Sequence, residues 1–461
     1  MNRYPAQTTP GALAYLTSPA DRDSEGFRTT EIFFYFLLHV PLALLMVRSP
    51  LISTLHALLT FVFGFLWVLS ARRPERAAYV GAYIVSAEVL WRMTGADVFW
   101  EFGKYALSAI LIIAVLRSKT HKLPTLPLMY FVLLLPSIVI TVGDMSLAEA
   151  REQIGFNLAG PFSLMISIWY FSNLKLSKSK FDRLLLVCIG PIVGIATATV
   201  YILATRPAIR FLGKSSYMAT GLGSPNQVGS VLGLGAFVAF MFFVIGTKQR
   251  RSLQVLILAL MIYFAVQGAL TFSRGGLYMA LVSAILLPLF LNDSRTRYKS
   301  VFAGLIVFAL AYYVLIPFLE NLTGGLLLHR FQDLSLTERD VIVLADLSIW
   351  RDNLLFGVGP GGAMYYREPI FLKPMSAATE FSRVLAEHGI FGFLSLVLFF
   401  IYIVKCLARP MKRPQRAIVI SLITWAILYM LIYAMRLVAP AFVVGLASLG
   451  SFVEEGDIDG H

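Results

Sequence analysis

The sequence predicts an all-α, polytopic integral membrane protein with about 12 to 14 transmembrane helices and a large, partly helical loop outside the membrane. Three observations lead to this fold class. The chain of 461 residues is 58% hydrophobic and 14% charged, with a mean hydropathy of +0.75, whereas soluble domains carry about 25% charged residues. Apolar stretches long enough to cross a membrane recur along the chain. Basic residues gather in alternate connections between these stretches.

Each transmembrane helix needs about 20 apolar residues, with a range of about 17–25, and about fourteen stretches meet this requirement. They begin near Ile32, Leu51, Ala78, Val98, Leu126, Phe156, Leu184, Gln227, Leu253, Leu277, Val301, Val384, Ala417 and Val438. The last stretch is short and is the weakest prediction. The stretch that begins near Val98 contains Glu101 and Lys104, which a membrane tolerates near a helix end or as a pair that faces other helices.

The orientation follows from the positive charges in the connections. Six alternate connections are basic: residues 71–76, 117–122, 175–183, 248–251, 295–299 and 405–416. All six lie on one side of a fourteen-span arrangement, and this bias makes that side cytoplasmic. Both termini are then cytoplasmic, and the segments 143–155, 205–226, 272–276 and 320–380 face the other side. Because topology explains the net charge of +13, we predict no nucleic-acid partner.

The predicted spans divide the chain into five regions. These are a cytoplasmic N-terminal segment (1–30), the first eleven transmembrane helices (31–318), an outward-facing loop (319–382), the C-terminal transmembrane helices (383–453) and a cytoplasmic tail (454–461). Within the loop, Val341 to Leu355 is predicted to form a helix that packs against the bundle or lies at the membrane surface. Pro360, Gly361 and Gly362 end this helix in a turn.

Metal, disulfide and nucleotide sites are not predicted. The two cysteines and six histidines show no ligand spacing, so we expect no metal and no cofactor. A polar, charged segment precedes the first apolar stretch, so no cleavable signal peptide is expected. Gly357-Val-Gly359-Pro-Gly-Gly362 matches a dinucleotide-binding pattern, but that site needs a preceding strand and a following helix. Close backbone packing is the expected reason for these glycines.

Basic residues on the outward side run against the orientation bias and are the first candidates for a site. Arg206, Arg210 and Lys214 recur every four residues, so on a helix they share one face. Arg274 lies in a tight turn between two spans. Like charges at this spacing repel each other, and arginine binds phosphate with a bidentate fork, so a lipid pyrophosphate is the expected anion. The alternative is that these residues contact lipid headgroups or pair with acidic residues of the outward loop.

Two further groups of charges each allow two interpretations. Arg339 and Asp346 share a helix face, so they form either a structural ion pair or part of a substrate site. Glu380 and Glu387 are each spaced for an ion pair with Arg383 at the start of the twelfth span. Alternatively, Glu380 faces the site as a general base or as a ligand of sugar hydroxyls.

Four segments resemble the O-antigen ligase and O-antigen polymerase superfamily of bacterial membrane glycosyltransferases. They are Gly223-Ser-Pro-Asn-Gln227, Thr271-Phe-Ser-Arg-Gly-Gly276, Phe356-Gly-Val-Gly-Pro-Gly361, and Glu380-Phe-Ser-Arg-Val-Leu-Ala-Glu-His-Gly389 followed by Gly392. The resemblance covers roughly residues 200–405. No single motif is decisive, but their order and spacing together are fairly specific.

The resemblance implies an enzyme of the bacterial inner membrane whose active site faces the periplasm. Such enzymes move a glycan from undecaprenyl pyrophosphate to an acceptor sugar, with inversion and without a metal or a nucleotide sugar. The acceptor is another lipid-linked glycan for a polymerase and the lipid A–core oligosaccharide for a ligase. Membrane lipids and a chain-length regulator are further implied partners. Arg210 and Arg274 match the family's essential arginines, which would bind the pyrophosphate, and Arg339 matches a further recurrent arginine; Arg206 and Lys214 would assist them.

One position departs from the family pattern. The family usually has a histidine nine residues before the glutamate that corresponds to Glu387, and Ala378 occupies this position. That histidine is the expected base for the proton of the acceptor hydroxyl, and alanine cannot accept a proton. Either the chain is an inactivated variant, which we favour, or another group such as Glu380 serves, or the protein is not an active transferase.

The sequence barely separates a polymerase from a ligase, and we favour a polymerase. A transporter of lipid-linked glycans would also need outward arginines, but it would have repeated halves with polar groups at mid-membrane, which the sequence lacks. A non-catalytic partner in polysaccharide assembly is a third alternative, which Ala378 makes more plausible. The sugar, its linkage and the oligomeric state are not predicted.

Overall fold

The computed structural model describes residues 29–453, with gaps at 71–72, 119–121, 206–214, 216, 247–249, 292–297, 299–303, 305–312, 314–315, 334 and 336–337. The described part of the chain is almost entirely helical, and two strands of 3 residues each are its only β-structure. The all-α prediction is therefore confirmed for these residues.

The first half of the chain contains α1 (Thr29–Arg48), α2 (Pro50–Ser70), α3 (Glu75–Met93), α4 (Phe102–Arg117), α5 (Thr125–Val132), α6 (Ile138–Asp144), α7 (Leu147–Ser172), β1 (Lys175–Ser177) and α8 (Lys178–Ala204). Side-chain caps start α7 and α8. The hydroxyls of Ser146 and Ser177 accept hydrogen bonds from the backbone N–H groups of Glu149 and Lys180, both at 3.3 Å. Each cap satisfies one of the free N–H groups in the first turn.

The second half contains η1 (Tyr217–Ala219), α9 (Pro225–Ile245), α10 (Arg251–Leu270), α11 (Arg274–Phe290), α13 (Ile316–Thr323), α14 (Leu326–Gln332), α15 (Arg339–Asp352), α16 (Ala363–Tyr366), α17 (Glu368–Phe371), α18 (Glu380–Ala408), α19 (Arg413–Ile432), α20 (Ala439–Ala447) and β2 (Ser451–Val453). α15 confirms the helix predicted in the outward loop. It packs against α18, where Trp350 stacks on Phe393 with ring centres 6.1 Å apart.

Eight helices in the described part of the chain are long and apolar enough to cross a membrane: α1, α2, α7, α8, α9, α10, α18 and α19. They support a membrane protein with several spans. The span predicted from Leu126 is not one helix, because turns at 133–137 separate α5 from α6, and Pro136 disfavours helical backbone at the residue before it. The span predicted from Val438 forms only α20, with 9 residues. The span predicted from Val301 lies mostly outside the described residues.

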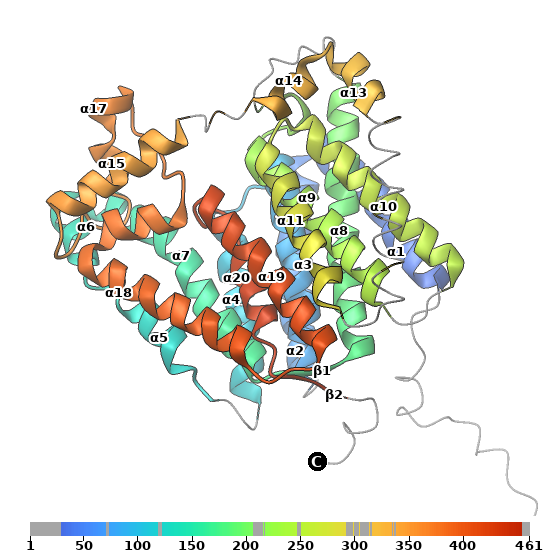
Figure 1. The fold of residues 1–461 in the computed structure, drawn as a ribbon, viewed down its shortest axis with the longest axis horizontal. Helices are drawn as coiled ribbons and strands as arrows, with labels where there is room; N and C mark the ends of the chain where they lie inside the picture. The colour runs from blue at the N-terminus through green and yellow to red at the C-terminus, as the bar shows by residue number, and fades with distance from the viewer. Residues whose placement is uncertain are drawn as a thin grey trace, which may run out of the picture.

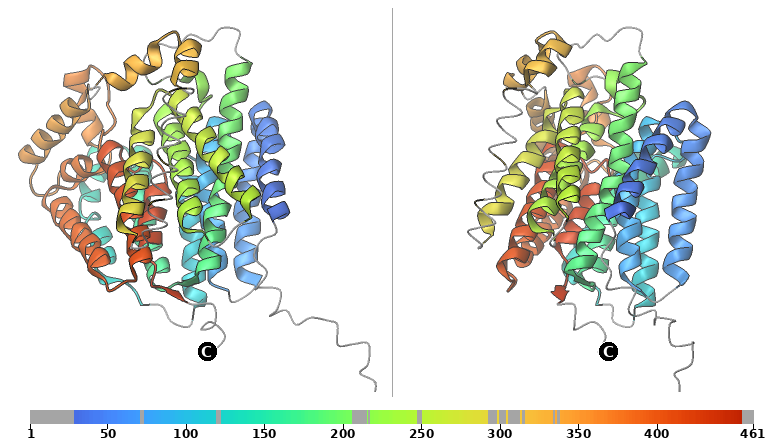
Figure 2. Two further views of the ribbon diagram at one scale, coloured as in Figure 1. Left: turned by 45° about the vertical axis from the view of Figure 1, so that its right-hand side comes forward. Right: turned by 90° about the vertical axis from the view of Figure 1, so that its right-hand side faces the viewer.

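The helices form a bundle whose two ends carry different structures. α3 packs against α8, α9 against α10 and α11, α11 against α19, and α7 against α20. At one end β1 and β2 pair in parallel, with Lys175 opposite Ser451. α13, α14, α15 and α17 lie at the opposite end (Figure 1, Figure 2). The loop 319–382 is thus remote from the basic connection 175–183, in agreement with the charge pattern.

Glycines let α9 and α11 touch backbone to backbone. A Cβ atom on Gly276 would lie 2.1 Å from the carbonyl oxygen of Gly229, and one on Gly233 would lie 2.2 Å from the carbonyl oxygen of Gly276. Only a residue without a side chain permits this approach. The contact fixes the start of α11, and therefore Arg274, beside the start of α9.

The glycine-rich turn after α15 is bonded to a break in α18. Gly357, Gly359 and Gly389 have φ angles of 67°, 77° and 59°, and the N–H of Gly359 donates to the carbonyl of Glu387 at 3.0 Å. A Cβ atom on Gly357 would lie 2.4 Å from the carbonyl carbon of Glu387. Close backbone packing is therefore the reason for Gly357 and Gly359, as the sequence predicted, and the same packing involves Gly389.

Candidate functional site

Three arginines from three elements gather at the end of the bundle that carries α13–α15. Arg274 is the first residue of α11, Arg330 lies in α14, and Arg339 is the first residue of α15. Burial lowers the pKa of Arg330, and the nearby Arg274 and Arg339 add to this effect while Asp333 opposes it. Desolvation and like charges both disfavour a cation, so a bound anion would stabilise this cluster. We call these three residues the arginine cluster.

Backbone carbonyls hold two members of the arginine cluster. Arg274 Nη2 donates to Ser335 O at 2.7 Å, and Arg339 Nη1 donates to Ile432 O at 2.9 Å. Of the three members of the arginine cluster, only Arg330 forms an ion pair with another described residue, and its Nη1 lies 3.2 Å from Asp333 Oδ2. Arg274 and Arg339 are half-buried, and a guanidinium has five N–H donors. Both therefore keep donors and positive charge for an anion.

A strained turn precedes Arg274. Phe272 is fully buried and has a φ angle of 57°, a conformation that residues other than glycine rarely adopt. Its carbonyl accepts a hydrogen bond from Arg330 Nε at 3.5 Å. Backbone strain of this kind persists where the surrounding structure holds it, and it is concentrated at binding sites.

Tyr433 joins the arginine cluster to the starts of α9 and α11. The Ser273 hydroxyl donates to Asn226 Oδ1 at 3.0 Å, so its oxygen accepts from the Tyr433 hydroxyl, also at 3.0 Å. The Arg339 guanidinium lies 4.8 Å from the centre of the Tyr433 ring, within range of a cation–π interaction. Two motifs that are separate in the sequence, around Asn226 and Ser273, therefore meet at this site.

The connector between α19 and α20, Ile432–Val438, is held by charged side chains from three helices. Arg339 of α15 donates to Ile432 O, and Met435 N donates to Glu380 Oε2 of α18 at 2.9 Å. Two residues of α3 hold the rest of the connector. Arg92 Nη1 donates to Arg436 O at 3.0 Å, and Val438 N donates to Glu88 Oε2 at 2.8 Å. Charge-assisted hydrogen bonds are stronger than neutral ones. Both halves of the chain therefore fix this connector, which carries Tyr433 and Arg436.

Arg436 and Lys104 converge on Phe156 of α7. The Arg436 guanidinium lies 4.2 Å from the centre of the Phe156 ring, and Lys104 Nζ lies 5.7 Å from it. Arg436 Nη1 also donates to Asn157 Oδ1 at 3.4 Å. Burial, with a smaller effect of nearby arginines that Glu387 and Glu380 oppose, lowers the pKa of Arg436 to about 10. Arg436 therefore remains a cation at neutral pH.

The charged residues at the start of α18 form the ion pairs that their spacing predicts. Arg383 binds the two oxygens of Glu380 at 3.1 and 2.5 Å, and it also contacts Glu387. All three side chains are buried. Glu380 Oε2 accepts the Met435 N–H as well, so both oxygens of this carboxylate are bonded.

Asp346 pairs with Arg367, and the alternative of an ion pair with Arg339 is wrong. Arg367 Nε donates to Asp346 Oδ1 at 2.6 Å, and the Ser382 hydroxyl donates to Oδ2 at 2.7 Å. The side chains of Arg367 and Asp346 are 1% and 0% exposed. Asp346 turns toward α18, whereas Arg339, two turns earlier, bonds to the Ile432–Val438 connector. Arg367, which follows α15 in the chain, therefore forms the ion pair with Asp346 in place of Arg339.

Ala378 lies in the non-helical segment just before α18. Its side chain is buried, with 8% exposure, and Thr379 beside it caps the helix by accepting from Ser382 N at 3.0 Å. The position at which the family resemblance implies a histidine therefore lies at the entrance to the ion-paired start of α18. It carries no titratable group.

The structure brings together two of the residues that the sequence predicts for the site, Arg274 and Arg339. Arg206, Arg210 and Lys214 lie outside the described residues. Glu380 and Ala378 lie next to each other at the start of α18, and Glu380 touches the same connector as Arg339.

Four residues of this region were not predicted: Arg330, Tyr433, Arg436 and Lys104. A signal existed for Arg436, which is a basic residue in the outward connection between the last two predicted spans. That position runs against the orientation bias in the same way as Arg274. Tyr433 gave no signal because its role comes only from its contacts with Ser273 and Arg339.

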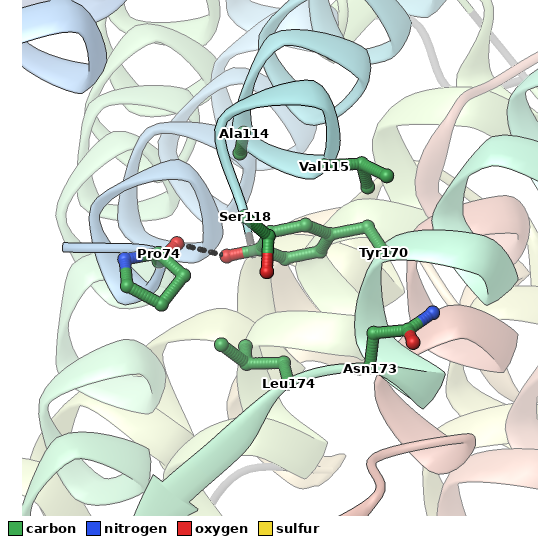
Figure 3. A pocket seen from close by; sticks show the side chains of 7 residues that line it. All are labelled: Pro74, Ala114, Val115, Ser118, Tyr170, Asn173 and Leu174. Atoms are coloured by element: carbon green, nitrogen blue, oxygen red, sulfur yellow. Dashed lines mark hydrogen bonds between the residues drawn. The ribbon is translucent and has the colours of Figure 1, made fainter. Parts of the chain in front are cut away.

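A small pocket lies where α3 begins and where α4 and α7 end. It is lined by Pro74, Ala114, Val115, Ser118, Tyr170, Asn173 and Leu174 (Figure 3). These residues lie at the start of α3 and the ends of α4 and α7, whereas Arg92, Lys104 and Asn157 lie toward the opposite ends of the same helices. The Tyr170 hydroxyl donates to the Pro74 carbonyl at 2.5 Å. This pocket has no charged lining residue and is separate from the arginine cluster.

No protein-family model matches the chain, and no curated protein matches it in sequence. The function must therefore be inferred from the residues and the geometry of the site.

Proposed function

We propose that the protein is a glycosyltransferase of the bacterial inner membrane that moves a glycan from undecaprenyl pyrophosphate to an acceptor sugar. The chain crosses the membrane about 12 to 14 times, and the arginine cluster faces the periplasm. One observation supports this most. Arg274 and Arg339, which are 65 residues apart in the sequence, lie together with Arg330 and are held by neutral carbonyls.

In the proposed reaction the arginine cluster binds the pyrophosphate of the donor. The acceptor hydroxyl oxygen attacks the anomeric carbon from the opposite face, and the bond from that carbon to the pyrophosphate oxygen breaks. Negative charge then develops on the departing pyrophosphate. Preorganised guanidinium groups stabilise this charge through paired, charge-assisted hydrogen bonds.

The proton of the acceptor hydroxyl requires a base. The position that the family resemblance assigns to this role is Ala378, and Glu380 has both oxygens bonded to Arg383 and Met435. We therefore assign Glu380 to holding the connector and α18 together. It follows that the chain transfers glycan slowly and that the substitution Ala378→His raises the rate.

The acceptor separates the two forms of the proposal. We favour a polymerase, in which the acceptor is another lipid-linked glycan. A ligase, with lipid A–core as the acceptor, is the alternative. Both would use the arginine cluster in the same way, so the choice depends on the product and not on the donor site.

The test is a transfer assay on purified Ala378→His protein in lipid. With lipid-linked glycan alone a polymerase lengthens the lipid-linked chains, whereas a ligase gives product only after lipid A–core is added. The matched variant Ala378→Asn has a polar side chain of similar size without a base and should stay slow. Absence of any new glycosidic bond with folded Ala378→His protein and both acceptors would contradict the proposal. Movement of lipid-linked glycan across the membrane without bond formation would identify a transporter.

A further inference from the structure

Lys104 has a fully buried side-chain amine on α4. Its side chain is 0% exposed, and Nζ has no hydrogen-bond partner among the described residues. An ammonium group has three N–H donors, and burying it without a partner is costly. Structural burial alone therefore does not account for a lysine at this position.

The carboxylates beside Lys104 do not neutralise it. Glu88 lies against the neighbouring Gly103, but its two oxygens are bonded to Arg92 Nη2 at 2.6 Å and to Val438 N at 2.8 Å. Glu101, at the start of α4, is half-buried and forms no ion pair with Lys104. Arg92 is a further nearby cation, so the local balance favours an anion.

Arg436 is the second basic side chain beside Phe156. It is half-buried, and Asn157 is its one hydrogen-bond acceptor among the described residues, at 3.4 Å. Its remaining N–H donors form a fork that suits a carboxylate or a phosphate. The Phe156 ring contacts both basic side chains, and Glu387 and Glu380 also lie near Arg436.

We infer that Lys104 and Arg436 form a second oxyanion subsite, which binds a carboxylate or phosphate of the acceptor while the arginine cluster binds the donor. The identity of the acceptor rests on the proposed function, whereas anion binding itself does not. Arg436 grips the anion at the accessible side, and Lys104 supplies a point charge behind it. The Ile432–Val438 connector separates the two sites, since Tyr433 contacts the arginine cluster and Arg436 contacts Phe156.

The arrangement implies a substrate preference. An acceptor with an acidic group near the attacked hydroxyl, such as a uronic acid or a phosphorylated sugar, gains a charge-assisted contact that a neutral acceptor lacks. The spacing of Tyr433 and Arg436 along one short connector then sets the distance between the two bound anions.

The test measures thermal unfolding of the full chain in lipid nanodiscs with inorganic phosphate and sodium glucuronate as probes. The double substitution Arg274→Ala and Arg339→Ala removes the two members of the arginine cluster that lack a carboxylate partner among the described residues, and it leaves Arg330, which is paired with Asp333. Lys104→Met and Arg436→Gln are then added singly. Lys122→Met, at an exposed lysine beyond the other end of α4, is the matched control.

At least one probe should raise the unfolding midpoint of the double variant. Lys104→Met and Arg436→Gln should each weaken that binding about tenfold or more, as loss of a charge-assisted contact requires, while Lys122→Met changes nothing. A response to glucuronate identifies an acidic sugar, and a response to phosphate alone identifies a phosphate group. If no probe binds the double variant, or if both substitutions leave binding unchanged, the inference is wrong.

Folding is not expected to obscure this result. Methionine has about the length of lysine, and Lys104→Met removes a buried amine that has no hydrogen-bond partner among the described residues, so the unliganded midpoint should stay or rise. Arg436 is half-buried, which makes Arg436→Gln an independent second variant. Normal binding here with no transfer by Ala378→His would contradict the proposed function alone. Transfer with no binding at Lys104 would contradict the second subsite alone.

Discussion

The arginines of the arginine cluster and those at the start of α18 are the same residue type in opposite settings. Arg274 and Arg339 are half-buried and donate to the neutral carbonyls of Ser335 and Ile432. Arg367 and Arg383 are 1% and 2% exposed and bind carboxylates. The first pair keeps its positive charge available, whereas the second pair is neutralised inside the fold.

This difference shows that the hydrogen-bond partner of an arginine, and not its charge alone, distinguishes a binding residue from a structural one. A buried arginine with a carboxylate on each side is part of the structure, because its removal leaves the carboxylates unpaired. An arginine held by carbonyls is positioned without being neutralised. The connector Ile432–Val438 touches both groups through Arg339 and Glu380, so the structural group fixes the geometry of the binding group.

Removal of a neutralised arginine should have the largest effect on stability. Arg383→Met leaves Glu380 and Glu387 buried without a cation, and we expect the free energy of unfolding to fall by about 3–5 kcal/mol. Arg274→Met should change it by less than about 1 kcal/mol, because a half-exposed arginine without a carboxylate is lost. Denaturant unfolding in detergent compares the two. Equal losses would remove the distinction between the two groups.

Removal of an available arginine should instead affect the reaction. In the Ala378→His background, Arg274→Ala should lower the transfer rate by about 10²–10³, the usual effect of losing one group that stabilises developing charge. Arg274→Lys should recover only part of the rate, because lysine keeps the charge but not the fork. Rates are measured as lipid-linked product over time. A rate that is unchanged in Arg274→Ala would show that this arginine does not touch the donor.

Tyr433 tests how the arginine cluster is held. Tyr433→Phe removes the hydrogen bond to Ser273 and should lower the free energy of unfolding by about 0.5–1.5 kcal/mol, while the ring still contacts Arg339. Tyr433→Leu removes both interactions. Binding of inorganic pyrophosphate, measured by calorimetry, should weaken in the leucine variant but not in the phenylalanine variant. Equal weakening in both would indicate that the hydroxyl, and not the ring, positions Arg339.

The smallest expected effect is a pH dependence at Asp333. The backbone N–H and hydroxyl of Ser335 donate to this carboxylate and hold its pKa below the usual range, and Arg274 and Arg330 contribute to the lowering. Such a group adds stability above its unfolded pKa of about 3.9 and loses it as the pH falls through the lower folded pKa. The unfolding midpoint of the parent should therefore decrease more steeply below about pH 4 than that of Asp333→Asn. Parallel pH profiles would contradict this role.

Much of the fold could be predicted from the sequence because hydropathy reports directly on burial in a membrane. The helix in the outward loop and the packing role of Gly357 and Gly359 follow from local patterns. The division of the Leu126 span was missed, although Pro136 was a visible cause. Local patterns predict the type of element, but they do not show whether an apolar stretch forms one helix or two helices joined by a turn.

The site was predictable only where a local motif carried it. Arg274 stands in a segment that resembles a known family, and Arg339 matches a recurrent arginine of that family, so both were found. The partner of Asp346 was not, because Arg367 is 21 residues away in the sequence and competes with the closer Arg339. Lys104 and Arg436 meet at Phe156 through three separate elements. Such convergence depends on tertiary packing, which no spacing rule reports.

The central claim is that the arginine cluster binds a pyrophosphate because Arg274 and Arg339 have no carboxylate partner among the described residues. Its most direct test is the affinity of the full chain in nanodiscs for undecaprenyl pyrophosphate, compared between the parent and the Arg274→Ala, Arg339→Ala double variant, with Lys122→Met as the control. We predict that the double variant binds about a hundredfold more weakly or worse, as the loss of two charge-assisted contacts requires, and that the control is unchanged. Equal affinity of the parent and the double variant would contradict the claim.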